Sequence, residues 1–268
     1  ACEKALNIND NPNSATESTP ELVLPQALVN TSQIILPYNT YGGRIMYFAN
    51  AGGVSGWANG FLDYNYTSGT EAALWSTTYN NLMDYNFVLN AAKGDTDKLA
   101  FFYAAQIMEA YNFANLIDMY NDIPYSEAFL GQNNLQPKYD KAEDIYADLA
   151  KKLDEAIIWF KAAGNSTSVF TTSDVLFKGN TVNWARFANT LKLKLILKGK
   201  GKVNFSNEVI DPIGVLTSDA IVQPVFTKID GKQNPMWNTW AYVASGGTVG
   251  TWGTQFIPTE FLISFYDG

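Results

Sequence analysis

EAALWSTTYNNLMDYNFVLNAAKGDTDKLAFFYAAQIMEAYNFANLIDMYNDIPYSEAF, residues 71–129, is the stretch of sequence that decides the fold. Apolar and aromatic residues recur in it at spacings of three and four, which predicts two helices that each present one apolar face. Gly94 suits the turn between them, because glycine readily takes the positive φ that follows a helix end. Pro124 requires the second helix to end before it, because the residue preceding a proline is pushed out of helical φ/ψ. The segment therefore predicts a helical hairpin.

The two faces of this hairpin follow from the spacing. The predicted face of the first helix consists of Trp75, Tyr79, Leu82, Asn86 and Leu89, and that of the second consists of Leu99, Tyr103, Ile107, Tyr111, Ala114 and Asp118. Ala104, Ala105 and Ala110 flank the second face, and small side chains there allow close approach. Lys93-Gly94-Asp95 is the predicted turn, in which Asp95 or Thr96 can accept the free amides of the second helix.

Helices are predicted in further segments as well. The segments are residues 21–36, 44–49, 139–164 and 183–199, with a polar, hairpin-like interruption at 167–181. Pro25 suits the first turn of the first of these helices. In the third, Asp140 and Glu143 have capping-box spacing and Gly164 fits the C-terminal cap, while Asn183 is the expected cap of the fourth. The third helix has a regular apolar stripe, formed by Ile145, Leu149, Leu153, Ile157 and Phe160.

Length, composition and charge restrict the class of protein. A chain of 268 residues that is 47% hydrophobic predicts a folded globular protein. The formal net charge is −8 and no basic block is flanked by aromatic residues, so nucleic acid is excluded as the expected partner. One cluster of positive charge is interpreted as a solvated helix end, where cations favour the helix dipole. It consists of Lys192, Lys194, Lys198, Lys200 and Lys202.

The chain contains no histidine and one cysteine, and both facts restrict its chemistry. The absence of histidine excludes Ser-His-Asp and Cys-His catalysis and most transition-metal sites, and no cofactor or metal is expected. Cys2 cannot form an intrachain disulfide. The start Ala1-Cys2 resembles the processing site of a bacterial lipoprotein, in which the cysteine takes the lipid. The alternative is a buried thiol near a frayed terminus.

Two glycine-rich segments carry more aromatic residues than loops usually do. They span residues 50–70 and 234–256. Tryptophan and tyrosine rings in such segments suggest contact residues at the surface, so each segment is a candidate binding loop. The hypothesis is that the two loops line one ligand-binding patch made of Trp57, Asn59, Tyr64 and Tyr66 with Trp237, Trp240 and Trp252. An alternative for Trp240 is that it packs on the helical layer.

Six short motifs, in this order, resemble the SusD/RagB-like outer-membrane lipoproteins of Bacteroidetes. They are Asn11-Pro12-Asn13 behind Cys2, Trp75 with Tyr79 and Asn86, Asn121-Asp122-Ile123-Pro124-Tyr125, Lys138-Tyr139-Asp140, Trp184 with Phe187-Ala188-Asn189 and Leu191, and Asn234-Pro235. The chain is similar to roughly the N-terminal half of such proteins. It departs from them in having no acidic cluster directly after Cys2.

The resemblance implies a mostly α fold, a SusD-like α-α superhelix of tetratricopeptide-like helical hairpins with a loop-rich irregular region. It implies a tether at residues 1–19, then a single domain at 20–268 with its scaffold at about 20–200 and its ligand-facing region at about 201–268, incomplete at the C-terminus. Such a protein is anchored to the cell surface of the outer membrane by lipid on Cys2. It binds a nutrient, above all a glycan, without catalysis and delivers it to a SusC-like TonB-dependent transporter.

Two other classes of function remain open at this point. Helical hairpins can form a tetratricopeptide-like scaffold for a protein or peptide, and open helix grooves would favour it over exposed aromatic loops. A glycosidase could use a pair of carboxylates without histidine. Asp63, Glu71 and Glu109 are the carboxylates nearest the aromatic segments. Glu71 is explained more simply by a helix start, and Glu109 by an exposed helix face.

Overall fold

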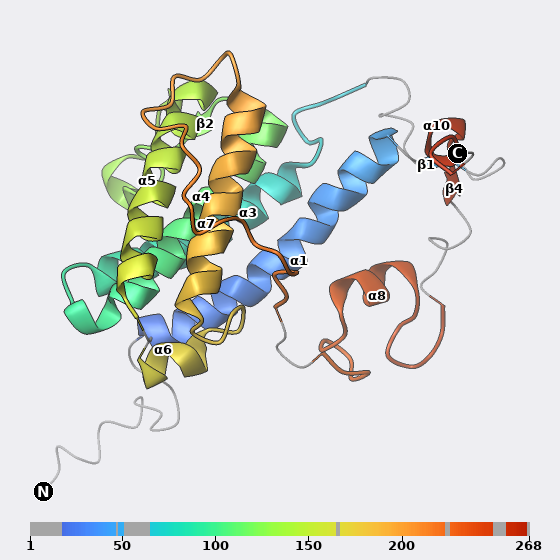
Figure 1. Ribbon diagram of the computed structural model, residues 1–268. Coiled ribbons are helices and arrows are strands. Elements are labelled where there is room, and N and C mark those ends of the chain that lie inside the picture. The colour runs from blue at the N-terminus through green and yellow to red at the C-terminus, as the bar shows by residue number, and fades with distance from the viewer. Residues whose placement is uncertain are drawn as a thin grey trace, which may run out of the picture.

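The computed structural model describes residues 18–46, 48–50, 65–164, 167–222, 226–248 and 256–266, and this part of the chain is mostly helical (Figure 1). The long helices are α1 (Pro20–Met46), α3 (Ala72–Ala92), α4 (Leu99–Tyr120), α5 (Ala142–Ala162) and α7 (Thr181–Gly199). The shorter ones are η2 (Thr96–Lys98), η3 (Gly131–Asn133), α6 (Ser168–Ser173), α8 (Pro235–Trp240) and α10 (Glu260–Ile263). No helix among the described residues is long and apolar enough to cross a membrane.

The predicted hairpin is confirmed as the pair α3 and α4. Gly94 has φ 80° in the turn, and α4 ends at Tyr120, ahead of Pro124. Asp95 accepts a hydrogen bond from the Asp97 amide at the start of η2, which leads into α4. The sequence signals at the turn and the exit therefore define this hairpin.

Helix α4 lies at the centre of the bundle, where it contacts α1, α3, α5 and α7. Its alanines Ala104, Ala105 and Ala110 are buried, as close packing requires. The predicted face of α3 is displaced, because Tyr85 and Val88 are fully buried whereas Trp75 and Tyr79 are only half-buried. Helix α3 packs against both α1 and α4, so its covered surface is wider than one stripe and is centred elsewhere.

The N-terminal helix differs from its prediction in length. Helix α1 begins at Pro20 and continues through Pro25 and Pro37 to Met46, so the two predicted helices at 21–36 and 44–49 are wrong as separate elements. Each internal proline removes a helical hydrogen bond. Burial of Leu24 and Leu28 against the bundle offsets this loss.

Short strands tie distant segments together in two antiparallel pairs. Strand β1 (Phe48–Asn50) pairs with β4 (Phe256–Pro258), and β2 (Ile123–Pro124) pairs with β3 (Tyr139–Asp140). Phe48 and Ala49 of β1 were predicted to be helical, and Asn50 was predicted to begin a loop. Their pairing partner follows them by more than 200 positions in the sequence, so local periodicity could not reveal it.

Helix α5 has the predicted apolar stripe and ends before Gly164, which has φ 61°. Its predicted capping box is wrong. Asp140 instead accepts hydrogen bonds from the amides of Tyr125 and Ser126, at 3.2 and 2.7 Å. The first amide of α5, that of Ala142, donates to Asp122 at 2.9 Å. The carboxylate that looked like a helix cap therefore holds the exit of the hairpin.

The region between α5 and α7 also differs from its prediction. Helix α6 occupies part of the expected hairpin-like interruption, and α7 is capped by Asn180, which accepts from the Asn183 amide at 2.9 Å. Asp174 follows α6 and is fully buried. Its carboxylate accepts from the Trp184 indole nitrogen at 2.8 Å, so it joins the turn to the core.

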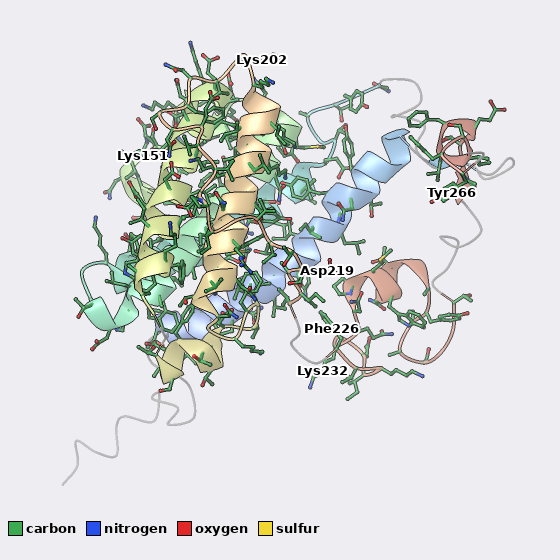
Figure 2. The ribbon with its side chains drawn as sticks, viewed as in Figure 1. Lys151, Lys202, Asp219, Phe226, Lys232 and Tyr266 are labelled. Atoms are coloured by element: carbon green, nitrogen blue, oxygen red, sulfur yellow. The ribbon has the colours of Figure 1, made fainter. Side chains whose placement is uncertain are left out.

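The lysine cluster is only partly a solvated helix end. Lys202 lies at the end of α7 and is exposed, as Lys200 is (Figure 2). Lys192, in contrast, is fully buried and donates to Asp154 and to the Val209 carbonyl, both at 2.7 Å. For Lys192 the interpretation as a solvated residue is wrong, because the chain after α7 passes over it and supplies an acceptor.

Beyond Gly199 the described chain runs along the bundle toward α1 and continues to α8, which contacts α1 (Figure 1). Asp219 lies at the edge of the bundle, whereas Phe226 and Lys232 lie beyond it (Figure 2). The helical bundle thus carries a region of short elements beside α1.

Candidate functional site

The predicted ligand-binding residues are only partly within the described structure. Trp57, Asn59, Tyr64 and Trp252 lie outside the described residues, as do Cys2 and Asp63. Trp240 closes α8, but its side chain is not among those described. The side chains of Tyr66 and Trp237 are described and are 44% and 49% exposed. Both are available at the surface, as the hypothesis of contact residues requires.

Beside Tyr66 the structure forms a pocket of about 410 Å³ at the N-terminal end of α3. Its lining combines three aromatic rings with three hydroxyl side chains and consists of Thr67, Ser68, Thr70, Ala72, Trp75, Tyr120 and Tyr139. We call this the Trp75 pocket. No charged side chain of the described residues lines it. Such a lining suits a neutral ligand that has both apolar faces and hydroxyl groups.

The rings of the Trp75 pocket come from three elements and are packed on one another. Tyr120, at the end of α4, meets the Trp75 ring edge-on at 5.1 Å between centroids. Tyr139, from β3, lies nearly parallel to Trp75, at 6.2 Å and 25°. Tyr139 is 64% exposed, so much of its surface is free to contact a ligand. The arrangement is an exposed tyrosine supported from behind by tryptophan.

Hydrogen bonds fix these rings in place. The Tyr120 hydroxyl donates to the Glu71 carbonyl at 2.7 Å, and the Tyr79 hydroxyl donates to the Pro124 carbonyl at 2.6 Å. Burial raises the pKa of Tyr120 above its usual value. The pairing of β2 with β3 sets Tyr139 opposite Pro124. The pocket is therefore organised by the exit of the hairpin, and it needs little rearrangement to accept a ligand.

The short segment before α3 brings hydroxyl groups to the pocket. Thr67 and Thr70 form a turn in which the Thr67 amide donates to the Thr70 hydroxyl at 2.9 Å. Tyr66, next to this turn, is hydrogen-bonded to Tyr41 of α1, and burial together with this bond raises the pKa of Tyr41 to about 12. Tyr66 is thus positioned by α1 at the edge of the Trp75 pocket.

A second pocket, of about 570 Å³, surrounds Trp237 on α8. Asn234 caps this helix by accepting from the amides of Met236 and Trp237, at 2.9 and 3.4 Å. The Trp237 ring packs against Tyr242 at 5.4 Å. This second pocket is lined by Phe226, Thr227, Lys228, Gln233, Asn234, Met236, Trp237 and Ala241. Tyr66 and Trp237 therefore belong to different pockets of the described structure.

The two aromatic segments are nevertheless connected through the β1–β4 strand pair. In the β1–β4 pair, Asn50 lies directly opposite Phe256. Asn50 begins the first predicted loop, and Phe256 ends the second. A contact between these two residues places the start of one aromatic segment next to the end of the other.

Glu71 and Glu109, the two described carboxylates of the alternative enzyme, do not line the Trp75 pocket. Glu109 is buried rather than exposed, and it pairs with Lys152 at 3.4 Å. Burial raises the pKa of Glu109, although Lys152 opposes the shift. Glu71 precedes α3 in the left-handed conformation, with φ 56°, and its side chain does not line the Trp75 pocket. The interpretation of Glu109 as an exposed helix residue is wrong.

The sequence reasoning missed the Trp75 pocket. Trp75 was assigned to the packing face of its helix, and Tyr139 only to the start of the next helix. The available signal was the accumulation of aromatic residues at both ends of the hairpin, including Tyr120. Their convergence depends on the pairing of β2 with β3, which the sequence pattern did not indicate.

Comparisons with known proteins give a consistent result. A SusD-like family model described as "Starch-binding associating with outer membrane" matches residues 12–241. A solved chitin-binding SusD homolog from Flavobacterium johnsoniae is 25% identical, with a TM-score of 0.62 over 81% of this chain and 48% of that one. No curated protein matches the chain.

Two further solved structures show the same fold at lower identity. A SusD homolog from Bacteroides vulgatus is 20% identical, with a TM-score of 0.64 over 89% of this chain and 46% of that one. One from Bacteroides uniformis is 24% identical, with a TM-score of 0.59 over 80% of this chain and 47% of that one. The chain therefore spans about half the length of the structures that it matches.

Proposed function

The chain belongs to the SusD-like family, and we propose that it binds a glycan nutrient at the outer membrane and delivers it to a SusC-like TonB-dependent transporter. The family consists of binding proteins rather than enzymes. Family membership supports the general role, and the Trp75 pocket supports the choice of a glycan. The transporter is inferred from the family alone.

The observation that carries the proposal is the exposed face of Tyr139 in a pocket whose described lining has hydroxyl groups and no charge. The apolar C–H face of a pyranose can lie on the tyrosine ring, which Trp75 supports from behind. Thr67 and Thr70 can exchange hydrogen bonds with the sugar hydroxyls. Tyr66, at the edge of the pocket, can contact a neighbouring sugar unit.

We extend the binding surface to the remaining predicted residues. Trp57, Asn59 and Tyr64 follow Asn50 in the sequence, and Trp252 precedes Phe256 by four positions. Because Asn50 and Phe256 are paired, the first segment starts where the second one ends. That pairing supports a surface shared by both segments, with Trp237 and Trp240 contributing from α8. Anchoring by lipid on Cys2, with residues 1–19 as a tether, completes the proposed arrangement at the cell surface.

Binding to a panel of polysaccharides and oligosaccharides, measured by affinity electrophoresis and calorimetry, tests this proposal. We expect dissociation constants between roughly micromolar and millimolar, because sugar hydroxyls must be desolvated. Tyr139→Ala should weaken binding at least about fivefold, since loss of a stacking contact costs about 1 kcal/mol or more. The matched control is Leu135→Ala, in the connector before β3, which removes an 81% exposed side chain outside the pocket.

Further variants test the shared surface. Trp57→Ala and Trp252→Ala should each weaken binding of longer oligosaccharides more than that of a monosaccharide. Full binding by both variants would exclude the shared surface while leaving the Trp75 pocket in place. Release of a shortened sugar during the assay would contradict a purely binding role. Binding of peptides alone would favour the tetratricopeptide-like scaffold instead.

A further inference from the structure

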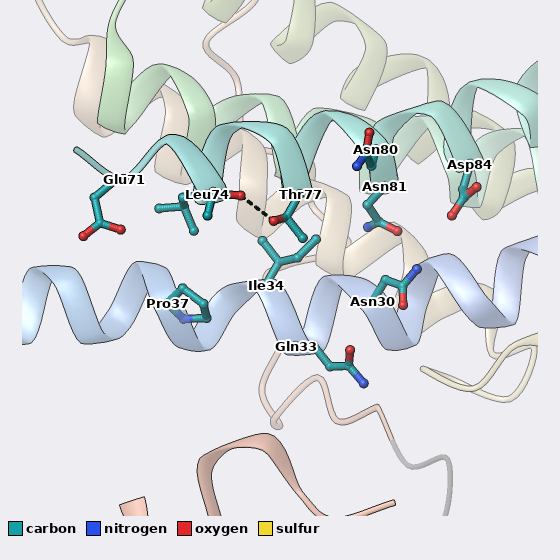
Figure 3. Close-up of a pocket in the computed structure, with 11 residues that line it drawn as sticks. Asn30, Gln33, Ile34, Pro37, Glu71, Leu74, Thr77, Asn80, Asn81 and Asp84 are labelled. Atoms are coloured by element: carbon teal, nitrogen blue, oxygen red, sulfur yellow. Dashed lines mark hydrogen bonds between the residues drawn. The ribbon is translucent and has the colours of Figure 1, made fainter. Parts of the chain in front are cut away.

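A groove of about 500 Å³ runs between α1 and α3 on another side of α3 (Figure 3). Its lining residues are Asn30, Gln33, Ile34, Pro37, Glu71, Ala73, Leu74, Thr77, Asn80, Asn81 and Asp84. Among the described residues, this lining contains two carboxylates and four amides, but no aromatic ring and no positive charge. Its chemistry is therefore different from that of the Trp75 pocket.

Asn81 has an unpaired acceptor in this groove. The side chain is only 3% exposed, and its Nδ2 donates to the Ala27 carbonyl at 3.2 Å and to the Thr31 hydroxyl at 2.9 Å. The Ala27 carbonyl can only accept, so the amide orientation is fixed. The opposite atom, Oδ1, has no hydrogen-bond partner in the described structure. A buried acceptor without a donor is rare and calls for a missing partner.

Asp84 lies one helical turn from Asn81 and is also short of a partner. Its carboxylate lines the groove, is half-buried, and forms no ion pair or hydrogen bond with the residues described. Burial alone raises the pKa of Asp84 above its usual value. Residues three apart on a helix have Cβ atoms about 5–6 Å from each other, so one group can contact both side chains. Figure 3 shows both side chains directed from α3 into the groove.

We propose that the groove between α1 and α3 binds a ligand carrying a protonated primary amine, which donates to Asn81 Oδ1 and to the Asp84 carboxylate. An ammonium group has three donors and one positive charge, which match two acceptors and one negative charge. Ile34, Leu74 and Pro37 form an apolar wall for the carbon skeleton beside the amine. Gln33 and Asn80 add hydrogen-bonding groups along the groove.

Two sources can supply such an amine, an amino sugar or a lysine side chain of a peptide. Calorimetric titration of the full chain, at a pH where the amines are protonated, distinguishes them. The probes are glucosamine against N-acetylglucosamine, and a peptide Ala-Lys-Ala with an acetylated N-terminus against the same blocked peptide with an acetylated lysine, so that lysine carries the primary amine under test. Each pair differs mainly in the charge and donors of the amine. We expect at least one amine to bind about tenfold more tightly than its acetylated partner, and the tighter amine identifies the source.

Variants locate the interaction. Asp84→Asn should weaken binding of the amine about tenfold and remove its dependence on ionic strength. Asp97→Asn, an exposed aspartate on η2 outside the groove, should leave binding unchanged. Equal affinity for the amines and their acetylated forms, or full affinity in Asp84→Asn, would overturn the proposal. Tyr139→Ala should leave amine binding intact, so failure at one site is separable from failure at the other.

Discussion

Replacing Asp174 with asparagine should destabilise the protein more than any surface substitution. Asp174 is fully buried between α6 and α7, and its two oxygens accept four hydrogen bonds. The donors are the amides of Leu176, Phe177 and Gly179 and the indole of Trp184. Trp184, the largest fully buried side chain, stacks on Phe160 with centroids 5.9 Å apart. The carboxylate therefore links a turn to the middle of the core.

The magnitude follows from the donors that lose their acceptor. Asparagine keeps one oxygen, so two of the four N–H groups would face an NH₂ group instead. Each buried donor left without an acceptor costs about 1–3 kcal/mol. The sum is about 4 kcal/mol, a large part of the roughly 5–15 kcal/mol that stabilises a typical domain.

Urea unfolding followed by far-UV circular dichroism measures this loss, provided that the slope with urea stays constant. Asp219→Asn, at an exposed position, is the matched control. Combining Asp174→Asn with Trp184→Phe should cost less than the sum of the two, because the indole donor is already gone. A loss below about 1 kcal/mol for Asp174→Asn would show that the turn accommodates the change and that the reasoning is wrong.

Three further predictions concern individual contacts. Lys192→Met should lower the free energy of unfolding by about 3 kcal/mol, because Asp154 is left without its cation. Adding Asp154→Leu to this variant should recover part of the loss, as measured by urea unfolding. Burial raises the pKa of Asp140, but hydrogen bonds from Ser126 and Tyr125 outweigh burial and hold this pKa below its usual value. The contribution of Asp140 to the free energy of unfolding is therefore present above about pH 4 and is lost as the pH falls below that value. Asp140→Asn should therefore flatten the acid limb of a plot of unfolding free energy against pH. Gly199→Ala should lower the melting temperature, because a Cβ atom would lie 2.8 Å from the Phe205 ring.

Local signals predicted the helices of the bundle well. Gly94, Pro124 and Gly164 mark ends that the structure confirms, because positive φ and the restriction before proline act on the adjoining residues alone. Periodicity identified the apolar stripe of α5, which packs mainly on one side. It located the buried face of α3 less well, because that helix is covered on two sides by α1 and α4.

Local sequence patterns failed to predict structure that depends on contacts between residues distant in the sequence. Phe48–Asn50 forms a strand only because residues 256–258 pair with it, and Lys192 is buried only because the chain near Val209 folds over it. Asp140 illustrates a different limit. Its spacing suits a helix cap, yet its carboxylate accepts hydrogen bonds from the amides of Tyr125 and Ser126 instead.

The aromatic residues show how far composition could indicate a site. The excess of aromatic residues predicted contact residues at the surface, and Tyr66 and Trp237 are exposed. Tyr139 was not predicted as a contact residue, because the sequence shows it only as the residue ahead of a helix. A binding role for Tyr66 and for the Trp75 pocket stays a proposal.

The two binding surfaces share α3 but should act independently. Trp75 and Asp84 are nine residues apart, about two and a half helical turns, so they lie on opposite sides of the helix. Between them, Thr31 of α1 is hydrogen-bonded to Tyr85 of α3 and to Asn112 of α4, at 2.7 and 3.2 Å. This buried network holds the three helices in one arrangement, and a ligand can couple two sites only by favouring another arrangement. The changes in binding free energy caused by Tyr139→Ala and Asp84→Asn should therefore be additive.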